Sequence, residues 1–285
     1  DERSPVIPLV TSTRENCLGA RCPQIQNCHV NLARREAMAA DVVVINHHLF
    51  FADLNIRESG VAELLPTVHA VVFDEAHQLN EIGVQFLGRQ LTTNQLDNFG
   101  RDLALQGQKM VLAHGDWPAM LTELGRSVQA LRGLCGAGQA APGRVAWETQ
   151  QPQGIGEQDW QRAVTDVHTA LQNTDIVLRS MEELSPELQS LHERAARLMS
   201  ELDIFSHAFE PGAVRWLEVS ASHVRMVQSP LDIADTMRSQ VVSAQGAAGR
   251  QKSWIFTSAT LGHDASMGHF VRSCGLEGAQ VLQVQ

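Results

Sequence analysis

The chain has 285 residues, a net charge of −10 at pH 7, and a composition that is 44% hydrophobic and 19% charged. These values are typical of a globular protein and exclude an intrinsically disordered chain or a uniformly basic nucleic-acid coat. No apolar run approaches the roughly 18 residues that a membrane-spanning helix needs. The start of the chain has neither the basic nor the apolar segment of a signal peptide, and no initiator Met. We therefore expect an internal fragment of a cytoplasmic protein with no membrane partner.

Three of the five cysteines, Cys17, Cys22 and Cys28, fall within twelve residues, whereas Cys135 and Cys274 are isolated. An odd count without a signal peptide argues for a reduced compartment rather than a disulfide framework. Iron–sulfur clusters take four thiolate ligands, and zinc does so too, although its cysteines usually form closer pairs. The cluster of three therefore predicts metal binding, with the fourth ligand upstream of the chain. The two isolated cysteines are expected to be ordinary small apolar residues.

The first third of the chain predicts alternating helix and strand. A helical pattern covers residues 30–40, and β-branched runs follow at 42–45 and 68–73. Such continuously apolar runs are typical of parallel strands buried on both faces. In open parallel sheets the ligand site lies outside the carboxyl ends of the strands. The polar residues that follow each run are therefore candidates for a site.

The middle of the chain is helical from 94 to 207 and carries most of the excess of acidic residues. Two apolar stripes with steps of three and four residues predict a long helical hairpin, with Ser185-Pro186 at the start of the second helix. Residues 134–156 are rich in Gly, Pro and Gln and predict a loop. This segment is expected to interrupt the α/β material.

The strand pattern returns after residue 211. Residues 215–219 and 224–227 predict a hairpin, 231–242 predict a helix that begins at Ser229-Pro230, and 254–256 predict another short buried strand. The predicted fold class is therefore α/β, with a parallel sheet interrupted by a helical insert.

Asp74-Glu75-Ala76-His77 directly follows the second apolar run. Mg²⁺ prefers one or two carboxylates together with water and phosphate oxygens, so Asp74 suits the role of holding Mg²⁺. Glu75 suits the role of a base that orients and deprotonates the attacking water in phosphoryl transfer. A solvated acidic turn is the alternative, and four residues alone do not decide between the two.

Thr257-Ser258-Ala259-Thr260 directly follows the last predicted strand. Small hydroxyl residues at this position can hydrogen-bond to the carboxylate site and to a loop that moves with the nucleotide state. Hydroxyl runs are common in turns, so the segment is weak on its own. The two segments together, each at the end of a buried strand and in this order, favour a nucleotide-hydrolysing motor.

At this point the chain resembles the XPD/DinG family of iron–sulfur superfamily 2 DNA helicases, and within it a bacterial, DinG-related branch. The resemblance is carried by the Cys-x4-Cys-x5-Cys stretch, by the motifs at residues 43–50, 71–79 and 255–262, and by their order around a helical insert. It implies a partial RecA-like motor domain 1 interrupted by a helical Arch domain, with the tail of an iron–sulfur domain. The implied layout is iron–sulfur tail at 1–30, motor domain 1 at 31–92 and 211–285, and Arch at 93–210.

The resemblance also implies roles for individual residues. Asp74 and Glu75 would be the catalytic carboxylates of motif II, with Asp74 on Mg-ATP, and His77 would couple them to motif III. Further implied sets are motif III (Ser258, Ala259, Thr260), three ligands of a [4Fe–4S] cluster (Cys17, Cys22, Cys28), and residues near the DNA track (Asn46, His47). A basic collar around the cysteines, which is equally well explained as a solvated arginine face, could contact DNA phosphates: Arg14, Arg21, Arg34 and Arg35.

The implied function is an ATP-dependent DNA helicase of 5′→3′ polarity in DNA repair or replication. Its cofactors would be ATP, Mg²⁺ and a [4Fe–4S] cluster. Its partners would be single-stranded DNA, forked or flapped duplexes, and a replication or repair protein, and it would associate with the bacterial nucleoid when on DNA. The alternatives are a DNA- or protein-binding scaffold with a degenerate motor, and a zinc-containing ATPase. The sequence contains no Gly-x4-Gly-Lys-Ser/Thr, so this chain alone is not expected to hydrolyse ATP.

Overall fold

A computed structural model describes residues 17–58, 65–109, 117–136, 143–207, 212–242, 252–261 and 266–282. The chain divides into two compact units. The first comprises Asp1–Gln26, Gln90–Pro211 and Arg215–Gln228, and the second comprises Asn27–Arg89, Gly212–Val214 and Ser229–Gln285. Each unit is described by itself.

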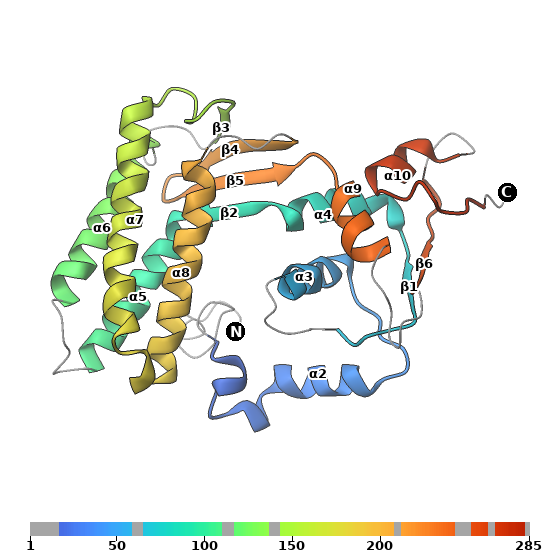
Figure 1. Cartoon of the computed structure of the whole chain (residues 1–285), viewed down its shortest axis with the longest axis horizontal. Coiled ribbons are helices and arrows are strands. Elements are labelled where there is room, and N and C mark those ends of the chain that lie inside the picture. Colours follow the sequence, from blue (N-terminus) through green and yellow to red (C-terminus); the bar gives the residue numbers. More distant parts are fainter. Residues whose placement is uncertain are drawn as a thin grey trace. The chain divides into compact units, whose positions relative to one another are not determined.

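The first unit is built on a helical bundle. Its helices are α5 (Thr93–Lys109), α6 (Trp117–Leu134), α7 (Glu157–Arg179) and α8 (Pro186–Ser206). Contacts join α5 to α6, α6 to α7, α7 to α8, and α8 back to α5, so the bundle closes on itself (Figure 1). The predicted helical hairpin is therefore confirmed as α7 and α8.

A four-stranded sheet completes the first unit, in the order β2-β5-β4-β3. The strands are β2 (Arg89–Thr92), β3 (Gly143–Trp147), β4 (Ala213–Val219) and β5 (Val224–Pro230). Strand β3 runs antiparallel to β4, with Gly143 opposite Val219. Along β4, Arg215, Leu217 and Val219 are buried while the intervening residues are more exposed, which is the alternation expected of a sheet covered on one face.

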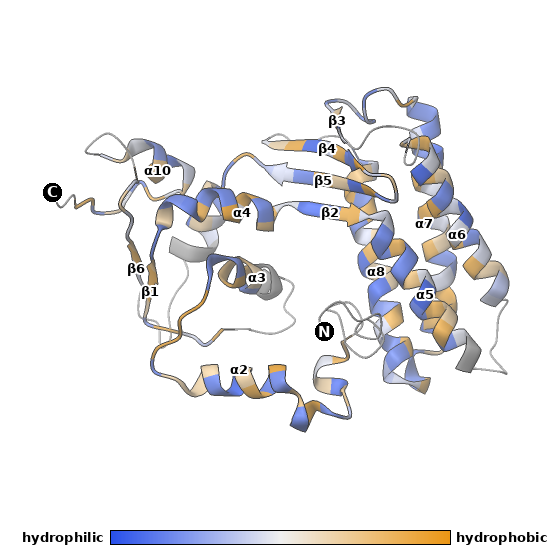
Figure 2. Cartoon of the chain, turned by 180° about the vertical axis from the view of Figure 1, so that it is seen from behind, coloured by the Kyte–Doolittle hydropathy of each residue, from blue (hydrophilic) through white to orange (hydrophobic). Residues whose placement is uncertain are grey.

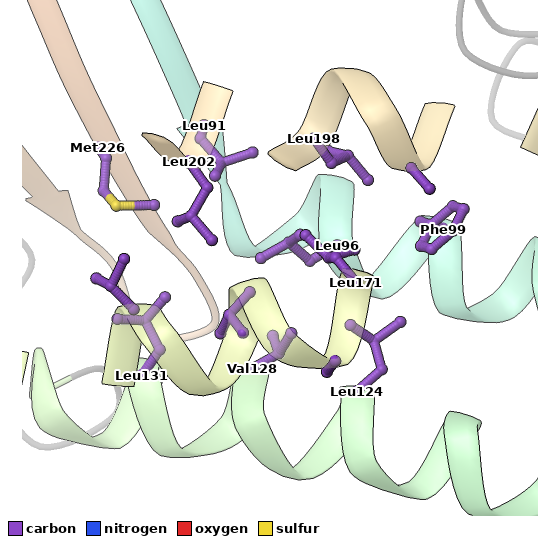
Figure 3. Close-up of a cluster of buried hydrophobic side chains, with 14 of the residues drawn as sticks. Leu91, Leu96, Phe99, Leu124, Val128, Leu131, Leu171, Leu198, Leu202 and Met226 are labelled. Atoms are coloured by element: carbon purple, nitrogen blue, oxygen red, sulfur yellow. The ribbon is translucent and has the colours of Figure 1, made fainter. Parts of the chain in front are cut away.

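The core of this unit lies between the helices and the covered face of the sheet. Figure 3 shows leucines and other apolar side chains from α5, α6, α7, α8, β2 and β5 converging on one cluster. The stripe predicted for α7 is buried at every step from Trp160 to Leu178. Each fully buried leucine or valine contributes about 1.5–3 kcal/mol relative to an exposed one, so the stripe stabilises the packing of α7 on the rest of the core.

The two ends of α8 are capped by side chains. At the first turn the Ser185 hydroxyl accepts a hydrogen bond from the Leu188 amide at 3.2 Å, as the sequence predicted. At the last turn the buried Arg215 guanidinium donates to the carbonyls of Ile204 and His207 at 2.7 and 2.8 Å. These bonds satisfy carbonyls that have no partner inside the helix.

The second unit contains a two-stranded parallel sheet of β1 (Ala70–Phe73) and β6 (Ser253–Phe256), which lie side by side in Figure 1. The helices of this unit are α2 (His29–Ala39), α3 (His47–Glu58), α4 (Leu79–Leu87), α9 (Ala234–Thr236) and α10 (Gly268–Ser273). Both strands carry hydrophobic residues, as the colouring of Figure 2 shows. The parallel pairing confirms the mixed α/β class predicted from the sequence.

Helices α3 and α4 pack closely in the core of the second unit. A Cβ added at Gly83 would lie 2.6 Å from the Ile233 side chain and 2.7 Å from the ring of Phe51, so only glycine is accommodated there without movement. Both of these neighbours are completely buried. The close approach of the two helices therefore depends on the missing side chain at position 83.

Some predicted elements differ from the structure. Residues 42–45 do not form a strand: none of the described strands pairs with them, and Val44 is 93% exposed. The predicted loop at 134–156 contains β3, because pairing with β4 overrides a weak local preference. The predicted helix at 231–242 begins at Ala234, since Ser229-Pro230 belongs to β5.

The expectation that the parallel strands are buried on both faces holds for one face only. Phe73 is 3% exposed, whereas Val72 and its partner Ile255 are 60% and 48% exposed. The described residues leave that face uncovered.

Among the described residues, no helix combines the length and apolar character needed to cross a membrane.

Candidate functional site

The parallel pairing of β1 and β6 brings two polar segments to the same edge of the sheet. Phe73 pairs with Phe256, so Asp74 and Thr257 are the first residues beyond the two strand ends. The Thr257 amide donates to the Phe73 carbonyl at 2.8 Å, and the Ala76 amide donates to the Thr257 carbonyl at 3.0 Å. The segments predicted to cooperate are therefore hydrogen-bonded to each other.

The Asp74 carboxylate is held through one of its two oxygens. Oδ1 accepts hydrogen bonds from the Thr257 hydroxyl and from the Glu75 amide, both at 3.0 Å. Asp74 is exposed on the edge of the sheet. An oriented, solvent-accessible carboxylate at the carboxyl end of a parallel strand is suited to hold a hydrated cation.

Glu75 adopts the left-handed backbone conformation, with φ 49° and ψ 43°. This conformation costs a residue other than glycine about 1–2 kcal/mol, so the surrounding structure must hold it in place. It turns the chain sharply after β1 and directs the Glu75 carboxylate, whose side chain is 58% exposed, toward His77. The two acidic side chains are therefore presented separately, one toward Thr257 and one toward His77.

The His77 ring connects the two segments. Its Nδ1 atom lies 3.0 Å from the Ser258 hydroxyl and 3.2 Å from a Glu75 carboxylate oxygen. The carboxylate can only accept, which favours the ring form with a proton on Nδ1. The Ser258 hydroxyl also accepts from the Thr260 amide at 3.2 Å, so Thr260 contributes its backbone and Ser258 its side chain.

An aromatic cluster packs around Phe73, the last residue of β1. The Phe73 ring lies parallel to those of Phe256 and Trp254, with centroids 5.2 and 6.1 Å apart, and Phe50 meets it edge-on at 4.8 Å. Phe73 directly precedes Asp74 in the chain. The rings therefore fix the direction in which the strand ends deliver the polar residues.

Asn46 and His47 lie at the start of α3. The Asn46 side-chain oxygen accepts from the Leu49 amide at 2.8 Å, which makes Asn46 the N-cap of the helix. The His47 ring packs 5.9 Å from that of Phe73. The structure therefore gives Asn46 a capping role and brings His47 next to the strand that carries Asp74, while their predicted place near DNA stays a prediction.

The three clustered cysteines lie on an irregular segment with short 3₁₀ turns at Gly19–Arg21 and Ile25–Asn27. None is in a disulfide, and Cys17 is exposed while Cys22 and Cys28 are half-buried. Cys17 and Cys22 belong to the first unit and Cys28 to the second. Within the described residues, no three or more His, Cys, Asp and Glu side chains come together in a way that could hold a metal ion. The three thiols have the donor chemistry that an iron–sulfur cluster or zinc requires.

The residues of the predicted basic collar have different environments. Arg21 makes a bidentate ion pair with Glu193 of α8, at 2.8 and 2.9 Å. Arg34 and Arg35 are exposed on α2, and Arg14 lies outside the described residues. The hydrogen bond from Arg21 lowers the pKa of Glu193, and the same bond raises the pKa of Arg21. Arg21 is therefore held in an ion pair with Glu193, whereas the side chains of Arg34 and Arg35 are accessible to solvent.

The isolated cysteines are buried, as the sequence predicted. Burial raises the pKa of the Cys135 thiol to about 12 and that of the Cys274 thiol to about 11. Both therefore stay protonated at neutral pH and lack the thiolate that reactive or metal-binding cysteines need.

Comparison with known proteins gives relatives along almost the whole chain. The ATP-dependent DNA helicase YoaA of Escherichia coli is 34% identical over 281 residues, which is 99% of this chain and 42% of that protein. YoaA of Haemophilus influenzae is 35% identical over 98% of this chain. The chain is therefore similar to YoaA helicases over almost its whole length. The ATP-dependent helicase DinG of Mycobacterium tuberculosis is 40% identical over 88 residues, or 30% of this chain.

The chain spans 42% of the length of its YoaA relatives. No family model matches the chain. The resemblance predicted from the order of the motifs is confirmed by these relatives. Sequence reasoning placed Thr257 in the hydroxyl segment that can bond to the carboxylate site, and the structure shows that its hydroxyl makes this bond to Asp74. The roles of Glu193 and Arg215 were not predicted, because no local pattern in the sequence signals them.

Proposed function

We propose that this chain forms part of an ATP-dependent DNA helicase, in which Asp74 and Glu75 take part in ATP hydrolysis that drives movement along single-stranded DNA. The observation that carries the proposal is the contact of His77 with both Glu75 and Ser258 at the edge of the parallel sheet. The names of the YoaA and DinG relatives support the same function.

The chemistry assigned to each residue follows from its position. Asp74, oriented through Oδ1, would hold Mg²⁺, which supplies charge neutralisation at the phosphates. Glu75 would orient the attacking water and accept its proton. A movement of the acidic turn, residues 74–77, would be transmitted through the contact of His77 with Ser258 to the turn after β6. The Thr260 amide would hold the Ser258 hydroxyl in place.

The helical bundle of the first unit would belong to the Arch domain, at residues 93–210. The parallel pair of strands would belong to motor domain 1, at residues 31–92 and 211–285. Residues 1–30 would be the tail of an iron–sulfur domain. Cys17, Cys22 and Cys28 would supply three thiolates to a [4Fe–4S] cluster, which would serve as a structural element near the point of strand separation. The donor chemistry supports this assignment.

The proposed DNA contacts involve the exposed guanidinium groups of α2. Arg34 and Arg35 are adjacent and accessible, and such groups bind phosphates without sequence preference. Asn46 and His47 would lie near the same track. The proposed substrates are single-stranded DNA and forked or flapped duplexes, along which the protein would move in the 5′→3′ direction. It would act in the bacterial cytoplasm, in DNA repair or replication, together with a protein partner.

The proposal is tested by strand displacement with the full-length protein that contains this chain. Duplexes carrying either a 5′ or a 3′ single-stranded extension are compared, with and without ATP. We expect ATP-dependent displacement of the strand on the 5′-tailed substrate. Displacement of the 3′-tailed substrate alone would overturn the proposed polarity, and binding of both substrates without any ATP-dependent displacement would favour a scaffold.

A matched pair of variants tests the DNA contacts. The double substitution of Arg34 and Arg35 by Gln should weaken single-stranded DNA binding and reduce the dependence of the affinity on salt. The control replaces Arg126 by Gln, which also removes an exposed guanidinium, from an ion pair within α6. Equal effects of both changes would contradict a contact made by α2.

A further inference from the structure

Thr257 bonds to the segment around Asp74 through its amide, its carbonyl and its hydroxyl. Its amide and its carbonyl both bond to the backbone around Asp74, and its hydroxyl donates to Asp74 Oδ1 at 3.0 Å. The same hydroxyl lies 3.4 Å from the Phe73 carbonyl. Ser258, the next residue, instead directs its hydroxyl to His77. Two adjacent hydroxyl residues therefore serve two different side chains of the acidic turn.

The two oxygens of the Asp74 carboxylate are not equivalent. Oδ1 accepts from the Thr257 hydroxyl and from the Glu75 amide. In the part of the chain that the structure describes, no group donates to Oδ2. A carboxylate fixed by two donors on one oxygen presents the other in one direction, which suits a cation that demands near-ideal octahedral geometry.

We propose that Thr257 is a positioning residue that occupies Asp74 Oδ1 and thereby presents Oδ2 to the divalent cation of the nucleotide. This inference rests on the proposed function, because it assumes that Asp74 holds Mg²⁺. In this account Thr257 orients the carboxylate that binds the cation, and Ser258 contacts His77 in the proposed coupling between the two turns. The role corresponds to the outer-shell hydrogen bonds that orient ligands at many metal sites.

The substitution Thr257→Val isolates the hydroxyl. Valine keeps the β-branched shape and both backbone hydrogen bonds of Thr257, and replaces only Oγ1 by a methyl group. Thr257→Ser restores the hydroxyl and should restore its effect. Thr122→Val, which removes an exposed hydroxyl bonded within α6, is the matched control.

The experiment measures ATP hydrolysis by the full-length protein as a function of Mg²⁺ concentration at a fixed, saturating nucleotide concentration. For Thr257→Val we expect the half-saturating Mg²⁺ concentration to rise roughly three- to tenfold, the effect of losing about one ordinary hydrogen bond. Thr257→Ser and Thr122→Val should match the wild type. An unchanged Mg²⁺ requirement in a folded Thr257→Val protein would overturn the proposal.

A second measurement covers the case in which the variant loses turnover for other reasons. Binding of a fluorescent ADP analogue is measured with Mg²⁺ and with EDTA. Thr257→Val should bind as the wild type does in EDTA and should lose part of the Mg²⁺-dependent gain in affinity. Equal losses under both conditions would contradict a role directed at the cation. A wild-type protein without Mg-ATP turnover would instead refute the proposed function, so the two failures are distinguishable.

Discussion

His77 Nδ1 lies 3.0 Å from the hydroxyl oxygen of Ser258, although 181 residues separate the two in the sequence. The same nitrogen lies 3.2 Å from the Glu75 carboxylate. One imidazole ring therefore links the turn after β1 to the turn after β6. A displacement of the acidic turn would be transmitted to the Ser258 turn through this ring.

If His77 links the two turns, Ser258→Ala should weaken the coupling between ATP hydrolysis and DNA unwinding. Without the hydroxyl, His77 keeps its contact with Glu75 but loses its partner after β6. We expect the number of ATP molecules consumed per base pair unwound to rise about threefold or more, as expected for the loss of about one hydrogen bond. Parallel measurement of ATP hydrolysis and strand displacement gives this ratio.

The control for this experiment is Ser239→Ala, which removes a hydroxyl bonded to the Asp235 carbonyl elsewhere in the same unit. It should leave the ratio unchanged. If Ser258→Ala also consumed ATP and unwound DNA in the wild-type proportion, the proposed coupling through His77 would be wrong.

The pair of Arg21 and Glu193 attaches the cysteine-bearing segment to α8. Glu193→Gln removes the charge from this pair. Because the pair is largely exposed, we expect a loss of no more than about 1 kcal/mol in the free energy of unfolding of the attached segment. Trypsin cleavage after Arg21 should become faster, while Glu183→Gln, which changes an exposed glutamate in the turn before α8, should have no such effect.

The same pair predicts a pH dependence. The pKa of Glu193 is lowered in the folded protein, chiefly by its hydrogen bond with Arg21, so its stabilising contribution is present above the unfolded pKa, about 4.3. The contribution is lost as the pH falls through the lowered folded value. The stability difference between wild type and Glu193→Gln should therefore be constant near pH 7 and shrink below about pH 4. A difference that grew on acidification would contradict this account.

Substitution of Arg215 should lower the stability of the first unit rather than the rate of catalysis. It is 5% exposed, donates to two carbonyls at the end of α8 and to Gln228, and lies over the rings of Trp147 and Phe205. Arg215→Met should keep part of the packing but leave these acceptors unsatisfied, at a cost of about 2–4 kcal/mol. Thermal unfolding measures this cost, and Arg126→Met is the exposed control. A shift no larger than that of the control would contradict the capping role.

The clustered cysteines predict iron in the protein purified without oxygen. Substitution of Cys22 by Ser should reduce the content of iron and acid-labile sulfide, whereas Cys135→Ala, at a buried and protonated thiol, should not. A colourless protein containing only zinc would replace the proposed cluster by the zinc alternative. Iron bound equally by both variants would exclude Cys22 as a ligand.

Several features of the fold could be predicted from the sequence because they depend on local periodicity. The stripes of α7 and α8 and the cap at Ser185 are examples, since each is a property of neighbouring residues. The polar turns after β1 and β6 were also predicted, because strands in a parallel sheet end at one edge. Their mutual contacts follow from the pairing of Phe73 with Phe256.

Other features depend on long-range pairing and carry little local signal. The strand expected at residues 42–45 has the right composition but no described partner strand, and a strand without a partner leaves its backbone groups without hydrogen bonds. Strand β3 forms in a Gly-rich segment because β4 pairs with it. The partnership of Arg21 with Glu193 joins positions 172 residues apart, which no spacing rule could indicate.

The most direct test of the account is ATP hydrolysis by the full-length protein, with and without single-stranded DNA, for the wild type, Glu75→Gln and the exposed control Glu81→Gln. We expect the wild type and Glu81→Gln to show turnover stimulated by DNA. Glu75→Gln should still bind nucleotide but lose about a hundredfold or more in rate, because it lacks the base. Turnover of Glu75→Gln at the wild-type rate would contradict the assignment of Glu75 as the catalytic carboxylate.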